Sequence, residues 1–128
     1  MGANSIDYQT AQRLKVGEVM LSRPKRLSVD ATVAEGRQLL TRRAVRLLLL
    51  VDGDVLLGSV SRDDLPVSAA EGARLIGFAR SDRPTVPPDV SMLDAINLLG
   101  SLGRLPVVDP VSGTLRGLIC LKSDGSGF

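Results

Sequence analysis

The sequence predicts an α+β fold made of two copies of one small unit, each with the element order strand, helix, strand, strand. The first observation behind this prediction is an internal repeat: at an offset of 59 residues, Asp30 falls on Asp89 and Gly58 falls on Gly117. The second is a helix-start pattern in each copy, and the third is a short apolar run followed by a turn in each copy. Chance identities would not keep the same order at one nearly constant offset.

Each copy opens with an extended segment followed by a helix. Thr32 precedes Glu35, and Ser91 precedes Asp94, so a hydroxyl stands three residues before a carboxylate and can satisfy the free N–H groups of a first turn. The first helix has a weak apolar face because it carries Gly36, which we expect only where another backbone packs close. The second helix has an apolar face at helical spacing, formed by Met92, Ala95, Ile96 and Leu99.

A short apolar run follows each helix, at residues 47–51 and 105–108, as in strands buried on both faces of a sheet. A turn comes next, and second strands at residues 55–60 and 114–121 close a hairpin. The second copy stops after Leu121, so it lacks a final helix. The N-terminal segment or another subunit could take that place. We expect a homodimer, because a truncated repeat leaves apolar surface to cover.

The predicted organisation is an N-terminal helix or extension (1–15), a first repeat (16–72), a second repeat (73–121) and a flexible C-terminal tail (122–128). A unit of about 60 residues buries only about 60% of its unfolded surface and is marginally stable alone. We therefore expect the two halves to share a core, with their sheets or helices facing each other.

Composition excludes several classes of function. The chain has no histidine, no tryptophan, one cysteine (Cys120), and 16 basic against 14 acidic side chains. These counts argue against histidine-based catalysis, a disulfide, a cysteine-built zinc site and an aromatic platform for single-stranded nucleic acid. We expect neither an enzyme nor a metal site, and no required cofactor. The longest run of large apolar residues, 47–51, is far shorter than a membrane span, so we expect a cytoplasmic protein without a membrane partner.

An ordered set of short motifs recurs along both copies. In the first copy they are Val19-Met20, Arg23-Pro24, 28–35, Arg46 and 58–65, and in the second copy they are 88–91, 104–109 and 117–119. This set resembles the CBS domain in its tandem form, the Bateman module. The resemblance implies two βαββα units related by pseudo-twofold symmetry with packed sheets, the second unit lacking its last helix. It also implies clefts between the units that bind AMP, ADP, ATP or S-adenosylmethionine, and further pairing into dimers.

The ligand signature of that family is a glycine, two residues, a serine or threonine, two residues and an aspartate, and it is matched by Gly58, Ser61 and Asp64. The resemblance implies that Asp64 binds the ribose hydroxyls and that Ser61 meets phosphate. Alternatively, Ser61 and Asp64 form only a capping box. The repeat and the glycine favour the ligand, and both roles can coexist. In the second copy Cys120 and Ser123 take the two polar positions, so we expect one competent site per chain.

Five further residues belong to the predicted nucleotide site. Val60 lies within the signature, and by analogy Lys25 meets the adenine through its backbone. Arg46, Arg62 and Arg104 are candidates for phosphate contacts, because a guanidinium matches phosphate oxygens. The alternative for each arginine is ordinary surface charge.

The predicted function is regulatory. The module would sense an adenosine-containing nucleotide and signal by a conformational change to a regulated protein whose identity the sequence does not give. The alternative is an interaction scaffold that has lost ligand binding and serves to dimerise or dock. Nucleic-acid binding through the arginines ranks third, because acidic residues balance them and aromatic residues are few, so no nucleic-acid partner is expected.

Overall fold

The computed structural model describes residues 5–128, and the chain divides into two compact units. One unit is Lys25–Arg83, and the other combines the described residues up to Pro24 with Pro84–Phe128. These units differ from the sequence copies. The segment before Pro24 belongs with the strands of the second copy, and residues 73–83 belong with those of the first. Each unit has its own cluster of buried apolar side chains.

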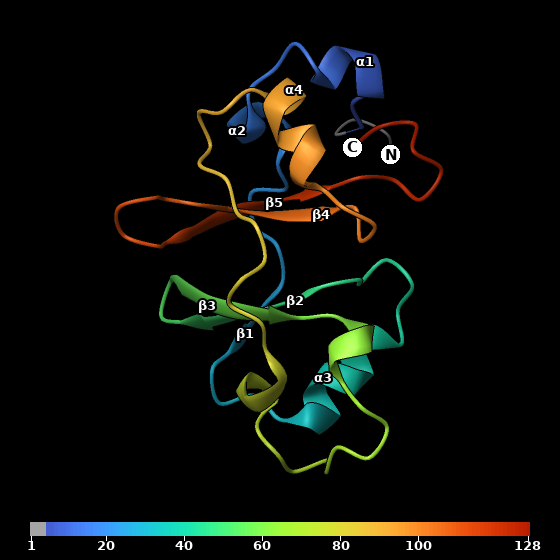
Figure 1. Ribbon diagram of the computed structural model, residues 1–128, viewed down its shortest axis with the longest axis vertical. Coiled ribbons are helices and arrows are strands. Elements are labelled where there is room, and N and C mark those ends of the chain that lie inside the picture. Colours follow the sequence, from blue (N-terminus) through green and yellow to red (C-terminus); the bar gives the residue numbers. More distant parts are fainter. Residues whose placement is uncertain (1–4) are drawn as a thin grey trace. The chain divides into compact units, whose positions relative to one another are not determined.

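The Lys25–Arg83 unit contains a three-stranded sheet with the order β1-β2-β3 (Figure 1). Strand β1 runs parallel to β2, and β3 runs antiparallel to β2. Gly53 has a φ of +61° in the turn between β2 and β3, a conformation that glycine adopts without strain. The elements follow the predicted order: β1 (Arg26–Ser28), α3 (Val33–Leu40), β2 (Leu48–Asp52) and β3 (Val55–Val60).

Helix α3 begins at the predicted capping box. The Thr32 N–H donates to Glu35 Oε1 (3.1 Å), and the Glu35 N–H donates to Thr32 Oγ1 (3.3 Å). Gly36 lies on the buried face, where a Cβ would come within 2.9 Å of both terminal methyl groups of Leu75. We expected a backbone to pack at Gly36. The close neighbour is instead a buried leucine side chain, so the glycine makes room for the core.

The segment after β3 forms a single 3-10 turn, η1 (Arg62–Asp64), where a helix was possible from the sequence. Pro66 disfavours a helical backbone at the preceding residue, and Leu65 is extended with a φ of −109° and a ψ of 100°. The chain continues to a second 3-10 turn, η2 (Leu75–Phe78), whose side chains pack in the core of this unit.

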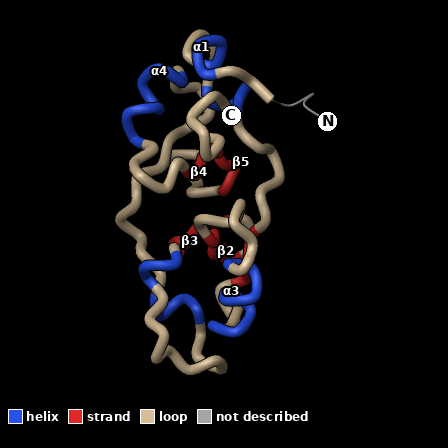
Figure 2. Tube along the Cα trace, turned by 90° about the vertical axis from the view of Figure 1, so that its right-hand side faces the viewer, coloured by secondary structure: helices blue, strands red, loops and turns tan. Residues whose placement is uncertain are grey.

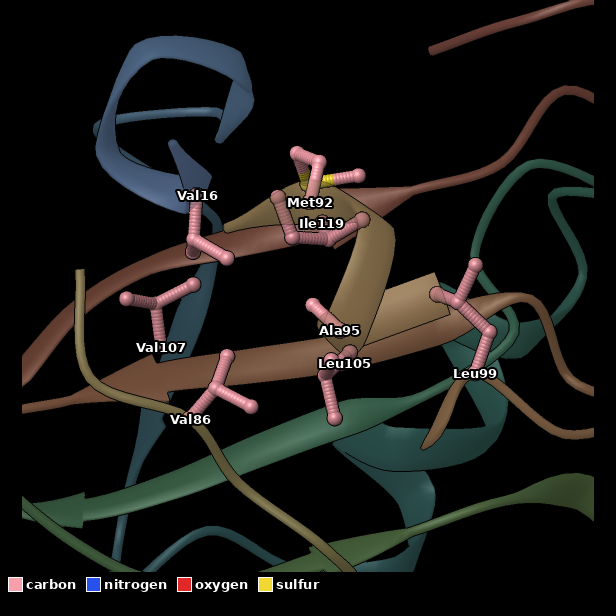
Figure 3. Close-up of a cluster of buried hydrophobic side chains, with 8 residues drawn as sticks. All are labelled: Val16, Val86, Met92, Ala95, Leu99, Leu105, Val107 and Ile119. Atoms are coloured by element: carbon pink, nitrogen blue, oxygen red, sulfur yellow. The ribbon is translucent and has the colours of Figure 1, made fainter. Parts of the chain in front are cut away.

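The other unit has a two-stranded antiparallel sheet of β4 and β5. Val86 forms a parallel bridge to Val107, where β1 pairs with β2 in the first copy. Its elements are α1 (Tyr8–Ala11), α2 (Val16–Val19), α4 (Met92–Ala95), η3 (Ile96–Leu98), β4 (Arg104–Val108) and β5 (Leu115–Cys120). Figure 3 shows its core, formed by Val16, Val86, Met92, Ala95, Leu99, Leu105, Val107 and Ile119. Among the described residues, no helix has both the length and the apolar character that crossing a bilayer requires.

The two sheets share an irregularity at equivalent positions. The register of β2 and β3 shifts after Leu50, which pairs with Gly58, and the register of β4 and β5 shifts after Val107, which pairs with Gly117. In each copy the shift leaves one extra residue on the second strand, a β-bulge. A bulge beside the same glycine in both sheets shows that the repeat extends to the backbone.

The N-terminal segment and the C-terminal tail belong to the same unit and lie side by side (Figure 2). Ile6 and Phe128 exchange two backbone hydrogen bonds of 2.9 and 2.8 Å, and the Tyr8 N–H donates to Ser126 O at 2.9 Å. The rings of Tyr8 and Phe128 stack with their centroids 6.0 Å apart. The tail that we expected to be flexible therefore has a bonded partner, and that partner is the N-terminal segment.

Candidate functional site

Ser61 and Asp64 come together at the end of β3, where the chain turns into η1. The Ser61 N–H donates to Asp64 Oδ2 at 2.9 Å, and the Ser61 hydroxyl donates to the same oxygen at 3.1 Å. Ser61 is 4% exposed, and the side chain of Asp64 is 13% exposed. The predicted link between the serine and the aspartate is therefore present.

Arg83 is the third member of this cluster. Its Nη2 lies 2.7 Å from Asp64 Oδ2 and donates to Ser61 Oγ at 3.1 Å. Its Nη1 donates to the Ser59 carbonyl oxygen at 3.1 Å. The Arg83 side chain is only 15% exposed. Arg83 is not among the predicted site residues, although Arg83-Pro84 repeats the Arg23-Pro24 pair of the first copy. The recurrence of an Arg-Pro pair in both copies was the pattern that could have pointed to it.

Gly58 explains why the segment carrying Arg83 reaches β3. A Cβ on Gly58 would lie 3.1 Å from both the Ala79 Cβ and the Arg80 carbonyl oxygen. Without that Cβ, Ser59 and Arg80 form an antiparallel bridge with hydrogen bonds of 3.0 and 2.9 Å. Arg83 follows three residues later and turns back to Asp64. The glycine of the signature thus has a packing role that fixes the position of the arginine.

Asp64 is held in its charged form. Burial alone would raise the pKa of its carboxyl group, but the hydrogen bond from the Ser61 backbone and the hydrogen bond and charge of Arg83 outweigh burial and lower the pKa below the usual value. The carboxylate is thus ionised at neutral pH, and it is an acceptor for hydroxyl and N–H donors only.

The other predicted residues of this unit have separate surroundings. Arg62 donates through Nε to the Leu40 carbonyl oxygen at 3.1 Å, and through Nη2 to the Leu40 carbonyl oxygen and, at 2.8 Å, to the Arg42 carbonyl oxygen. It therefore satisfies carbonyl groups at the C-terminal end of α3, where a cation is favoured. Val60 is fully buried in the core. Lys25 is exposed before β1, and Arg46 is half-buried before β2.

Arg104 belongs to the other compact unit. Its Nη1 donates to the Gly103 and Leu121 carbonyl oxygens at 3.1 and 3.0 Å. Of the predicted site residues, the structure brings together Ser61 and Asp64, with Gly58 supporting them.

The second copy has a different arrangement at the equivalent position. A cavity of about 770 Å³ is lined by residues 17–23 and Cys120, together with Ile6 and Phe128. A Cβ on Gly117 would lie 2.5 Å from Met20 Sδ and 2.7 Å from the Leu21 carbonyl oxygen, so this glycine also admits a neighbouring segment. Burial raises the pKa of the Cys120 thiol, although the charge of Arg104 acts in the opposite direction. The hydroxyl position of the signature is therefore held by a neutral thiol.

Comparison with known proteins identifies related sequences and folds. The family model of the CBS domain matches residues 16–65 and 73–123. No curated protein matches the chain significantly. A crystal structure described as an acetoin utilization protein (AcuB) from Vibrio cholerae is similar, with 27% identity over 84% of each chain and a TM-score of 0.73. These matches confirm the predicted resemblance and the tandem α+β fold.

Two further solved structures contain nucleotides. CBSX2 in complex with AMP is 27% identical, with 83% of this chain and 89% of that chain covered and a TM-score of 0.70. The cytosolic domain of the Mg²⁺ channel MgtE in complex with ATP is 24% identical, with 84% of this chain and 46% of that chain covered and a TM-score of 0.69. At that identity, the likeness to the channel domain concerns the fold alone.

Proposed function

The chain belongs to the CBS domain family and carries two copies of the domain, and from this premise we propose that it is a regulatory module that binds an adenosine-containing nucleotide at Ser61 and Asp64. The observation that carries the proposal is an ionised, largely buried carboxylate fixed at the end of β3 by the signature serine. Such a carboxylate can accept hydrogen bonds from the two hydroxyls of a ribose. The complex of the similar protein CBSX2 with AMP supports the same ligand class.

The proposed role is sensing rather than catalysis. The sequence offers no histidine, and the ionised Asp64 is already bonded to Ser61 and Arg83. Bound nucleotide would favour one conformation of the protein, and a partner protein would respond to that conformation. We place the protein in the cytoplasm, where adenine nucleotides are available.

Isothermal titration with AMP, ADP, ATP and S-adenosylmethionine tests this proposal. Asp64→Asn should weaken binding by about ten- to a hundredfold, because a charged hydrogen bond contributes about 1.5–3 kcal/mol. Asp63→Asn is the matched control, since Asp63 is the exposed neighbouring carboxylate and should leave affinity unchanged. Absence of binding by the wild type at millimolar ligand would overturn the proposal.

One observation favours the scaffold alternative: Asp64 already forms an ion pair with Arg83 of the same chain. A scaffold needs no ligand, and the internal ion pair would then be the final state of the site. Thermal melting separates the two functions: a binder at 100 times its dissociation constant gains about 2.7 kcal/mol of stability. A scaffold shows no rise in melting temperature with any of the four ligands.

We also propose a homodimer. Leu93 and Leu98, on α4 and η3, are 56% and 42% exposed, and a second copy could cover them. Sedimentation equilibrium of the wild type and of Leu93→Ser tests this proposal, with a shift of the variant toward monomer expected.

A further inference from the structure

We infer that Arg83 determines the ligand specificity of the proposed site by making it select adenosine ligands that carry a phosphate group at the ribose 5′ position. This inference rests on the proposed function of Ser61 and Asp64. In the structure the guanidinium of Arg83 holds Asp64. A ribose whose two hydroxyls bind one to each oxygen of Asp64 must take this position on Oδ2, and a phosphate on the ligand gives the displaced guanidinium a new partner.

One oxygen of the Asp64 carboxylate is already fully occupied within the protein. Oδ2 accepts from the Ser61 N–H at 2.9 Å and the Ser61 hydroxyl at 3.1 Å, and lies 2.7 Å from Arg83 Nη2. A carboxylate offers about four lone-pair positions on its two oxygens. Three contacts on one oxygen already exceed its two positions. A ribose that binds with one hydroxyl on each carboxylate oxygen needs a position on Oδ2 and therefore competes with Arg83.

Displacing Arg83 from Asp64 is costly. Its side chain is 15% exposed, and a poorly solvated guanidinium that loses its counter-charge is strongly disfavoured. The nearest acidic neighbour in sequence, Asp82, is engaged by Arg80 through two contacts of 3.0 Å. Because Asp82 is already paired with Arg80, we expect the new anion to come with the ligand. Phosphate suits this role, because its oxygens match the fork of a guanidinium.

Arg83 can exchange partners without leaving the site. Nη1 donates to the Ser59 carbonyl oxygen at 3.1 Å and to Ser59 Oγ at 3.3 Å, whereas Nη2 carries the contacts to Ser61 and Asp64. The guanidinium can turn about the Ser59 contact while Nη2 moves from the carboxylate to a phosphate. The bridge between Ser59 and Arg80 holds the backbone in place during this exchange.

The second copy gives an internal comparison. Arg23 is the repeat equivalent of Arg83, and Ser123 stands where the first copy has Asp64. There the arginine lines a cavity of about 770 Å³. Among residues 5–128, no carboxylate forms an ion pair with the Arg23 side chain. The arginine therefore forms an ion pair in the copy that has the aspartate, and the same aspartate is the proposed acceptor for the ribose hydroxyls.

The ligands fall into two classes on this basis. AMP, ADP and ATP carry phosphate at the 5′ carbon and can repair the loss of the Asp64 contact. Adenosine carries a neutral hydroxyl there, and S-adenosylmethionine carries a sulfonium cation, which a nearby guanidinium repels. We therefore expect the wild type to prefer AMP over adenosine by at least about tenfold, which corresponds to about 1.4 kcal/mol.

Titration calorimetry of the wild type, Arg83→Gln and Arg83→Lys with AMP and with adenosine tests the inference. Arg83→Gln should bind AMP more weakly and adenosine more tightly than the wild type, so the AMP-to-adenosine preference falls to within about threefold. Arg83→Lys, which keeps the charge without the fork, should give an intermediate preference and serves if the glutamine variant does not fold. Arg74→Gln is the matched control, because Arg74 is an exposed arginine of the same unit that pairs with Asp30, and it should keep the wild-type preference.

The outcomes separate this inference from the function on which it rests. If AMP binding depends on Asp64 but the preference is unchanged in both Arg83 variants, the role of Arg83 is wrong and the site stands. Equal binding of adenosine and AMP by the wild type also overturns the role of Arg83. If the wild type binds none of the nucleotides, the proposed function fails, and this inference fails with it.

Discussion

Arg83 Nη2 lies 2.7 Å from Asp64 Oδ2, so the aspartate of the ligand signature is already paired inside the chain. The ion pair joins two residues that are distant in sequence. The backbone bridge between Ser59 and Arg80 brings the segment that carries Arg83 next to Asp64. Gly58 permits that approach. The three residues therefore depend on one another: Gly58 admits the segment, and the segment places Arg83 against Asp64.

The Asp64–Arg83 pair should contribute measurably to stability. Asp64→Asn and Arg83→Gln should each lower the free energy of unfolding by about 1–3 kcal/mol, because each leaves a largely buried partner without a charged hydrogen bond. The double variant should lose less than the sum, with a coupling energy of about 0.5–3 kcal/mol. Urea denaturation at pH 7 measures all three variants. Strictly additive losses would contradict an interaction between the two side chains.

The contribution of Asp64 should depend on pH. Its pKa is lowered in the folded protein, whereas an unfolded aspartate has a pKa of about 3.9. The folded state therefore binds the proton less well than the unfolded state. The stabilisation is fully present above the unfolded pKa and is lost as the pH falls through the folded pKa. The difference in unfolding free energy between wild type and Asp64→Asn should shrink below about pH 4, and a constant difference down to pH 2 would be the contrary result in urea titrations.

The two signature glycines should differ in their tolerance of a side chain. Gly117→Ala places a Cβ 2.7 Å from a backbone oxygen, and Gly58→Ala places one at 3.1 Å, whereas a Cβ on Gly72 meets nothing within 4 Å. Overpacking costs about 1–3 kcal/mol. We expect Gly117→Ala to destabilise most, Gly58→Ala less, and Gly72→Ala least. Thermal unfolding ranks the three, and an equal effect at Gly72 and Gly117 would show that close packing is not the cause.

Arg62 should stabilise the C-terminal end of helix α3. Arg62→Ala removes the donors to the Leu40 and Arg42 carbonyl oxygens and should cost about 1 kcal/mol of stability. Hydrogen exchange should show faster opening of the last turn of α3. Arg43→Ala is the control, because Arg43 is exposed. Unchanged exchange in Arg62→Ala would mean that these contacts do not hold the helix end.

The sequence predicts the local structure well, because the patterns behind it are local. Thr32 and Glu35 form the capping box that their spacing predicts, and Ser61 and Asp64 form the predicted contact. Residues that act across the chain were not predicted. Arg83 lies on a segment that the bridge between Ser59 and Arg80 brings to β3, and Arg62 reaches carbonyl groups about 20 residues earlier in the chain. Neither partner can be read from spacing alone.

The joined chain ends should behave as an ordered element. Phe128→Ala removes the ring that stacks on Tyr8. We expect faster amide exchange at Ile6 and Tyr8, whose N–H groups donate to Phe128 and Ser126 carbonyl oxygens. Val111→Ala changes an almost fully exposed side chain and should leave this exchange unchanged. Rapid exchange at Ile6 and Tyr8 already in the wild type would show that the ends are not held together in solution.

A crystal structure of the protein with AMP bound would show whether Asp64 and Arg83 share the ligand as proposed. We expect both ribose hydroxyls within hydrogen-bond distance of the Asp64 carboxylate, with Arg83 Nη2 moved from Asp64 to the phosphate. AMP bound away from Asp64, with the 2.7 Å contact between Arg83 and Asp64 intact, would contradict it.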